Sequence, residues 1–139
     1  MKFNKLIPEL SVSNLNESLK FYVNSIGFKI EYQRPENKFV FISYQGTQFM
    51  LQELEENEKW SIGELKHPYG NGVNFQIEVS NVEKIHDALK TSGYKIAFDI
   101  EENWYRQDNK LLGNKEFLDR KSTRLNSSHY QQSRMPSSA

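Results

Sequence analysis

The chain has 139 residues, enough for one domain with a real core, and its 13% aromatic content suits a globular domain with an aromatic binding surface. It contains no cysteine, which excludes a disulfide framework and thiolate chemistry. The net charge of zero hides an uneven distribution. Residues 120–139 carry four basic and no acidic side chains, which leaves 14 basic against 18 acidic residues, a net of −4, in residues 1–119. This acidic body argues against a nucleic-acid partner and suits a cationic ligand.

The first half of the chain predicts a strand, a helix and three more strands. Residues 6–12 alternate in polarity and predict the first strand. Asn14 with Glu17 three residues later is typical of a capping box, and Gly27 is suited to end the helix that follows. Three further strands are predicted, at 28–33, 39–44 and 48–54. An acidic connection then runs to residue 69.

The second half predicts the same order, but ends early. A strand at 73–79 precedes a helix whose capping box is Ser80 with Glu83 and which Gly93 ends. Another strand is predicted at 94–100, a polar loop holds Trp104 and Tyr105, and a last strand begins at 115–118. One more strand is expected after Asp119, by analogy with the first half.

Two short segments recur in the two halves. Residues 12–15 (Val-Ser-Asn-Leu) return as 79–82 (Val-Ser-Asn-Val), and residues 27–30 (Gly-Phe-Lys-Ile) return as 93–96 (Gly-Tyr-Lys-Ile). Each pair flanks a predicted helix. The sequence therefore indicates a duplicated half-domain, and such repeats commonly build a pseudo-symmetric pocket.

Residues 120–139 differ in composition from the rest of the chain. They contain six serines and almost no apolar pattern, which predicts disorder. Residues 121–129 also resemble a tail found on many unrelated predicted proteins, in which sequencing-adapter DNA has been translated. We expect residues 120–139 to be a non-native disordered tail; a genuine flexible basic tail is the alternative.

Residues 12–22 (Val-Ser-Asn-Leu-Asn-Glu-Ser-Leu-Lys-Phe-Tyr), Gly27-Phe28 and residues 117–119 (Phe-Leu-Asp) resemble the vicinal oxygen chelate superfamily. This superfamily includes glyoxalase I, extradiol dioxygenases, fosfomycin-resistance enzymes and bleomycin-resistance proteins, and the chain is most similar to the last group. The resemblance implies an α+β fold in residues 1–119. Two tandem βαβββ modules, 1–69 and 70–119, would form a curved mixed-sheet cleft with flanking helices. Relatives continue after Phe-Leu-Asp into Pro-Asp-Gly and a final strand, whereas Arg120 follows here, which indicates a truncated C-terminal strand.

The resemblance also implies where metal ligands would stand. The first-strand positions correspond to Ile7 and Asn74, and the fourth-strand position of the first half to Gln52 or Glu53. Ile has no donor atom and neutral Asn is a weak ligand, while a transition metal generally needs at least three protein ligands. The histidines, His67, His86 and His129, lack helical ligand spacing. We therefore expect no metal, no cofactor and no catalytic residues.

Strand alternation places the polar residues of the two first strands on the concave sheet face, away from the helices. The candidate ligand-binding residues are Glu9, Phe39, Trp60, Gln76, Glu78, Trp104 and Tyr105. A solvated sheet face and local packing by the two Trp residues are the simpler alternatives.

Carboxylates and aromatic rings suit a planar cation. The resemblance implies a binding protein that sequesters a cationic, aromatic, glycopeptide-like antibiotic such as bleomycin at a homodimer crevice, and so confers antibiotic resistance. A metal-dependent lyase or oxygenase of the superfamily, and a housekeeping or stress protein, remain alternatives. We expect the protein to be cytoplasmic, because it lacks a signal peptide and any apolar run of about 18 residues, and to have no membrane partner.

Overall fold

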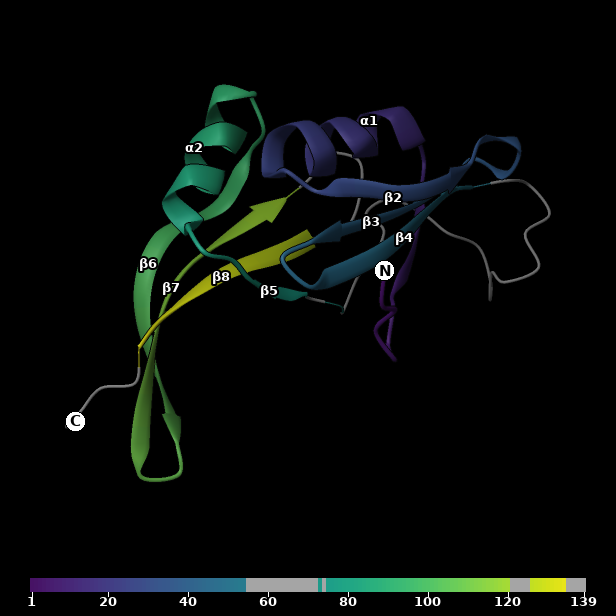
Figure 1. Ribbon diagram of the computed structural model, residues 1–139. Helices are drawn as coiled ribbons and strands as arrows, with labels where there is room; N and C mark the ends of the chain where they lie inside the picture. Colours follow the sequence, from purple (N-terminus) through teal and green to yellow (C-terminus); the bar gives the residue numbers. More distant parts are fainter. Residues whose placement is uncertain (55–72, 74, 121–125, 135–139) are drawn as a thin grey trace. The chain divides into compact units, whose positions relative to one another are not determined.

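The computed structural model describes residues 1–54, 73, 75–120 and 126–134 of the chain (Figure 1). It divides into two compact units, Met1–Tyr69 and Gly70–Ala139. Each unit has a four-stranded mixed sheet and a helix, so the fold is α+β with two βαβββ modules, as the sequence predicts.

Unit 1 contains β1 (Glu9–Val12), α1 (Leu15–Leu19), β2 (Lys29–Arg34), β3 (Phe39–Tyr44) and β4 (Thr47–Glu53). A π-helical segment, Lys20–Ile26, continues α1, and a short 3-10 turn, Pro35–Asn37, joins β2 to β3. The strand order is β1-β4-β3-β2. β1 runs parallel to β4, while the other neighbours are antiparallel.

Local sequence signals fix the ends of these elements. The side chain of Asn14 accepts a hydrogen bond from the Glu17 N–H at 3.0 Å and so caps α1, as predicted. Gly27 adopts a left-handed φ of 109° after the π-helical segment, a conformation that glycine adopts without strain. Gln45 and Gly46 both have positive φ in the two-residue connection between β3 and β4, which is typical of a type I′ hairpin turn.

The core of unit 1 lies between its helix and its sheet. Helix residues Phe21, Tyr22 and Ile26 are buried, and the Tyr22 ring contacts both Phe28 and Phe49. The sheet contributes buried apolar side chains on the same side: Leu10, Val12, Val40, Ile42 and Leu51. This apolar contact fixes which face of the sheet α1 covers.

Unit 2 repeats the element order of unit 1 with β5 (Gln76–Glu78), α2 (Val82–Thr91), β6 (Ile96–Gln107), β7 (Lys110–Arg120) and β8 (Asn126–Arg134). Its strand order, β5-β8-β7-β6, is the counterpart of that in unit 1. β6 and β7 are about twice as long as β2 and β3, and their hairpin runs past the end of β8 (Figure 1).

The cap of α2 differs by one residue from the sequence prediction. Asn81, not Ser80, is the N-cap, and its side chain accepts a hydrogen bond from the Lys84 N–H at 3.0 Å. Asn81 occupies the same place in the repeated segment as Asn14 in the first copy. The buried face of α2 comprises Val82, Ile85, His86 and Leu89.

Several predicted boundaries are corrected. The first strand starts at Glu9 rather than at residue 6, because Pro8 has no N–H for the ladder. The strand predicted at 73–79 is confined to Gln76–Glu78. Trp104 and Tyr105, predicted in a loop, lie in β6, since the β6–β7 ladder continues to the Gln107–Lys110 pair.

The disorder predicted for residues 120–139 is wrong for residues 126–134, which form β8. β8 pairs with β5 on one side and with β7 on the other. Without it, both strands would present unpaired N–H and C=O groups, which the backbone of β8 pairs. A polar segment can therefore complete the sheet although it lacks an apolar pattern.

Candidate functional site

In each unit the helix covers one face of the sheet, and most of the candidate residues that the structure describes lie on the other. The strand register of unit 1 places two rows of side chains on that face. The first row, across β1, β4, β3 and β2, is Glu9, Met50, Phe41 and Tyr32. The second row is Ser11, Gln52, Phe39 and Arg34. This face therefore combines one carboxylate with an aromatic cluster.

The aromatic rings of this face are packed against one another. Tyr32 stacks on Phe41, with centroids 5.1 Å apart, and contacts Phe39 at 6.0 Å. The Arg34 guanidinium lies 4.0 Å from the centroid of Phe39, a cation–π contact. Phe39 is only 4% exposed, so a ligand can reach this predicted residue only if its cover moves. Glu9 on the same face is exposed.

Unit 2 presents the polar residues of β5 on the corresponding face. Gln76 and Glu78 are exposed, whereas Ile77 and Val79 are buried towards α2. In the register of the sheet, Glu78 pairs with position 130 of β8, which pairs in turn with Glu116 of β7. Neighbouring strands lie about 4.8 Å apart, so Glu78 and Glu116 stand roughly 10 Å apart across the sheet.

Glu116 is the most unusual side chain of this face, because it is a carboxylate with only 8% exposure. Its Oε1 accepts a hydrogen bond from the Asn103 side-chain amide at 2.7 Å and another from the Tyr105 hydroxyl. Among the described residues its buried Oε2 has no hydrogen-bond partner. Glu101 occupies the paired position on β6. Glu78, Glu101 and Glu116 therefore concentrate negative charge on one sheet face, which we call the acidic face.

Trp104 and Tyr105, which the structure places in β6 rather than in the predicted loop, point to opposite sides of the sheet. Tyr105 shares the acidic face with Glu116, whereas Trp104 pairs with Gly113 on the face that α2 covers elsewhere. A Cβ built on Gly113 would lie 2.6 Å from the Trp104 ring, so the ring rests on the glycine. The structure brings together Gln76, Glu78 and Tyr105 on one face but not Trp104. Trp60 lies outside the described residues.

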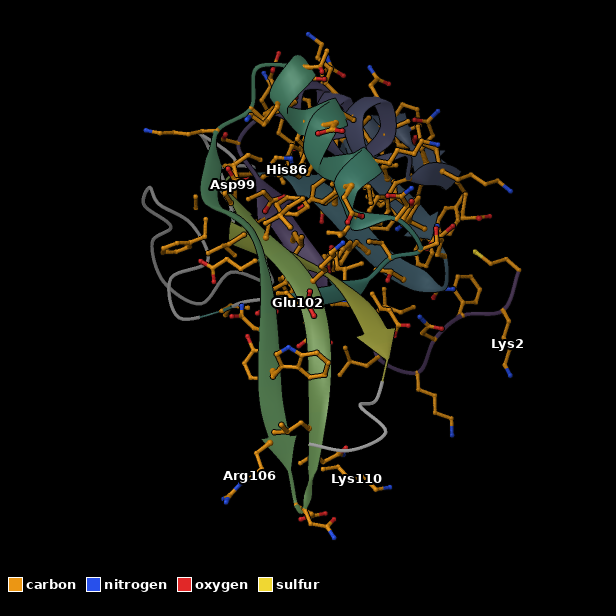
Figure 2. All side chains as sticks on the ribbon, turned by 90° about the vertical axis from the view of Figure 1, so that its left-hand side faces the viewer. Lys2, His86, Asp99, Glu102, Arg106 and Lys110 are labelled. Atoms are coloured by element: carbon orange, nitrogen blue, oxygen red, sulfur yellow. The ribbon has the colours of Figure 1, made fainter. Side chains whose placement is uncertain are left out.

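His86 belongs to the buried side of α2 rather than to the acidic face. Its ring contacts Phe117 edge-on at 5.2 Å. Its Nε2 lies 2.6 Å from Asp99 Oδ1 on β6 (Figure 2). The Ile100 N–H, and secondly His86, lower the pKa of Asp99 below its ordinary value of 3.8. His86 therefore connects α2 to the sheet. His67, and the side chain of His129, lie outside the described part of the chain.

An ion pair makes a second connection between α2 and the sheet. Lys115 Nζ on β7 lies 2.7 Å from Glu83 Oε1 in the first turn of α2, and both side chains are about half exposed. The hydrogen bond from Lys115 lowers the pKa of Glu83 below 4.5, and the same bond raises the pKa of Lys115 above 10.5. Lys115 is thus held on the helix side of the sheet and does not neutralise the acidic face.

The described residues do not fit the metal site of the superfamily's metal enzymes. Ile7 has no donor atom, and Asn74 lies outside the described residues. Glu53 faces α1, where its carboxylate accepts a hydrogen bond from the Leu15 N–H at 3.1 Å and pairs with Lys38 at 2.8 Å. Within the described ranges no three His, Cys, Asp or Glu side chains are placed to hold a metal ion. No metal-dependent step is therefore assigned to this chain.

Sequence reasoning missed several residues of these faces, among them Tyr32, Glu101, Asn103 and Glu116. Asn103 and Tyr105 are two residues apart in a strand, so they share a face. That signal was hidden because the segment was interpreted as a loop. Glu116 sits beside the apolar Phe117 and Leu118, and nothing in the sequence alone distinguishes it from a solvated glutamate.

The fold and the two faces define a class of protein: paired βαβββ units, each with a helix on one side of its sheet and polar and aromatic side chains on the other. The chain belongs to the Glyoxalase/Bleomycin resistance protein/Dioxygenase superfamily, whose family model matches residues 6–108. A search of curated protein sequences finds no significant match.

Solved structures with the same fold span nearly the whole chain. TioX from Micromonospora sp. ML1 is 14% identical, with a TM-score of 0.73, covering 94% of this chain and 99% of its own. Protein SA1046 of S. aureus is 21% identical, with a TM-score of 0.66 and coverages of 94% and 95%. An integron cassette protein of V. cholerae is 13% identical, with a TM-score of 0.68 and coverages of 94% and 97%. At these identities the likeness establishes the fold alone. None of the described helices is long and apolar enough to cross a membrane.

Proposed function

We propose that this protein binds and sequesters a small, cationic, aromatic molecule of the bleomycin type, as a homodimer with its ligand in a crevice between the two copies. The acidic face of unit 2 is the observation that carries this proposal. Three carboxylates share it with the Tyr105 ring, and one of them, Glu116, is buried with an oxygen that no described residue hydrogen-bonds. A buried carboxylate oxygen without a partner is costly, and a cationic hydrogen-bond donor would satisfy it.

Binding alone accounts for a resistance function, because a sequestered antibiotic needs no chemical change. The described residues lack the donor set that a metal-dependent reaction of this superfamily requires. Aromatic rings and carboxylates together recognise a flat cation by stacking and by charge. These features support sequestration over catalysis.

The test is a titration with bleomycin, followed by quenching of tryptophan fluorescence, of the wild type and of two neighbouring variants. Glu101→Gln removes a charge from the acidic face. Glu102→Gln removes the same charge from the opposite face of β6, where Glu102 pairs with Lys115 in the register (Figure 2). We expect Glu101→Gln to weaken binding severalfold, because the loss of a close charge pair lowers the binding affinity by at least that much. Glu102→Gln should leave the affinity nearly unchanged.

Equal affinities of the two variants would contradict the acidic face as the ligand surface, and no quenching at micromolar bleomycin would contradict the ligand class. Metal analysis of the purified protein provides a separate check. Stoichiometric Ni, Zn, Fe or Mn would overturn sequestration in favour of a metal-dependent enzyme. Analytical ultracentrifugation should give the mass of a dimer.

A further inference from the structure

The N-terminal residues 1–4 cross the face of the unit 1 sheet that lies opposite α1. The Gln48 side chain holds them from both sides: its Oε1 accepts a hydrogen bond from the Asn4 N–H, and its Nε2 donates to the Lys2 carbonyl, each at 2.7 Å. The Asn4 side-chain amide also donates to the Gly46 carbonyl at 2.9 Å. Gln48 is 7% exposed, so this attachment is largely shielded from water. We call residues 1–4 the N-terminal strap.

The attachment positions one aromatic ring of the strap. Phe3 meets the ring of Phe41 edge-on, with centroids 5.4 Å apart and planes at 88°, and meets Tyr32 in the same manner at 6.5 Å. Tyr32 and Phe41 are themselves stacked, with their planes at 15°, and together form what we call the aromatic shelf. Phe41 is 1% exposed, whereas Phe3 remains 54% exposed. A half-exposed ring therefore helps to cover a fully buried one.

The strap is suited to open locally. Phe3 leaves about half of its surface in water, so its burial stabilises the closed position less than a core phenylalanine would. Its neighbours Met1, at 62% exposure, and Leu6, at 78%, add little to the attachment. Segments with few buried contacts open at a small fraction of the free energy of global unfolding. Opening would uncover the parts of Tyr32 and Phe41 that Phe3 contacts.

Carboxylates flank the shelf. Glu9 lies in the same cross-strand row as Phe41, two strand spacings or about 10 Å away. Glu31 accepts a hydrogen bond from the Ser43 hydroxyl at 2.8 Å, and Ser43 lies two residues from Phe41 on β3. Two cations share these surroundings: Lys29 Nζ lies 3.7 Å from Glu31 Oε1, and the Arg34 guanidinium lies 5.8 Å from the centroid of Tyr32. A cationic substituent on a planar ring in the position of Phe3 would therefore be directed towards Glu9.

We propose that the aromatic shelf, Tyr32 and Phe41, is a ring-binding subsite for a planar aromatic group of the cationic ligand, and that Phe3 occupies this subsite when the ligand is absent. This inference rests on the proposed function. It places the aromatic ring of the ligand and the ring of Phe3 at the same position, so that only one of them can be there at a time. The strap then competes with the ligand, and the apparent affinity equals the intrinsic affinity multiplied by the fraction of molecules with an open strap.

The test measures binding of two probes, bleomycin and the planar cation ethidium, to the wild type and three variants. Phe3→Ala removes the competing ring, and Gln48→Ala releases the strap with its ring intact. Leu6→Ala, at an exposed apolar residue just beyond the strap, is the control. We expect Phe3→Ala to bind about threefold to tenfold tighter, in line with the value of an edge-on aromatic pair. Gln48→Ala should change affinity in the same direction, and Leu6→Ala should behave as the wild type.

Hydrogen exchange of the Asn4 amide supplies a readout that is independent of affinity. Since a ligand on the shelf displaces the strap, the Asn4 N–H loses its Gln48 acceptor and should exchange faster in the wild type when either probe is bound. Tight binding with unchanged Asn4 protection, and no gain in Phe3→Ala, would overturn the subsite while leaving the proposed function intact. No binding to the wild type or to Phe3→Ala would overturn both.

Discussion

At the scale of single residues, the contact between Gly113 and Trp104 explains why residue 113 is a glycine, which no sequence pattern predicts. A Cβ at residue 113 would stand 2.6 Å from the Trp104 ring, closer than real side-chain contacts. The ring is 44% exposed, so it can move away rather than disrupt the sheet. Glycine is therefore needed at position 113 because a side chain there would collide with the Trp104 ring, and not because of the backbone dihedral angles of residue 113.

Gly113→Ala should displace the Trp104 ring into water and cost about 1 kcal/mol of stability through local overpacking. In a Trp60→Phe background, where Trp104 is the only tryptophan, fluorescence should shift to the red and urea unfolding should report the loss. In a Trp104→Ser background, followed by circular dichroism, the same glycine substitution should cost almost nothing. An equal cost in both backgrounds would mean that the ring is not the reason for the glycine.

At the scale of the elements, two polar contacts connect α2 to its sheet: Glu83 with Lys115, and His86 with Asp99. The first pair is half exposed, so its contribution is small and depends on salt. Because the pKa of Glu83 is lowered in the folded state, its stabilisation is present above its ordinary pKa of 4.5 and is lost as the pH falls through the lowered value. Because the pKa of Lys115 is raised above 10.5, the stabilisation is also lost as the pH rises through that raised value.

The variants Glu83→Gln, Lys115→Gln and their combination should form a double-mutant cycle with a favourable coupling at neutral pH. Thermal unfolding at neutral pH, and again in acid well below pH 4.5, measures that coupling. We expect the coupling to disappear in acid, where Glu83 is protonated in the folded and unfolded states alike. A coupling that persists in acid would show that the two side chains interact other than as an ion pair.

The sequence predicted the order of elements well because that order rests on local signals. Asn14 and Gly27 act within a few residues of themselves, and the recurrence of their segments transferred the same prediction to unit 2. Trp104 and Tyr105 were placed in a loop because both faces of their hairpin are polar, which removes the alternation that marks a half-buried strand. The strand that contains them is held by backbone hydrogen bonds to β7, and the polar sequence on either side gives no sign of this pairing.

The candidate site was predictable only in part. Successive side chains of a strand point to opposite faces of the sheet. Once the apolar residues of the strand are expected to face the helix, Gln76 and Glu78 must therefore lie on the other face. The burial of Phe39 under Arg34 and the hydrogen bonds to Glu116 depend on which residues β2 and β6 bring alongside, and therefore on register. The N-terminal strap depends on a buried amide, Gln48, whose partners lie more than forty residues away.

At the scale of the whole molecule, the two units are variations on one arrangement with different chemistry on the face away from the helix. Unit 1 carries aromatic rings with Arg34 over Phe39, and unit 2 carries carboxylates with Tyr105 against Glu116. A ligand with a flat ring and a positive charge suits both kinds of face. The name of the family to which the chain belongs includes bleomycin-resistance proteins, and TioX and the other solved structures share its fold.

The most direct test of this account is a map of the amide chemical shifts that change when the full chain is titrated with bleomycin. We predict that the largest changes occur at Glu78, Glu101 and Tyr105 on the acidic face, and at Tyr32 and Phe41 on the aromatic shelf. Changes confined to α2 and to the opposite side of β6, around Glu102 and Trp104, would contradict the claim that the sheet faces away from the helices bind the ligand.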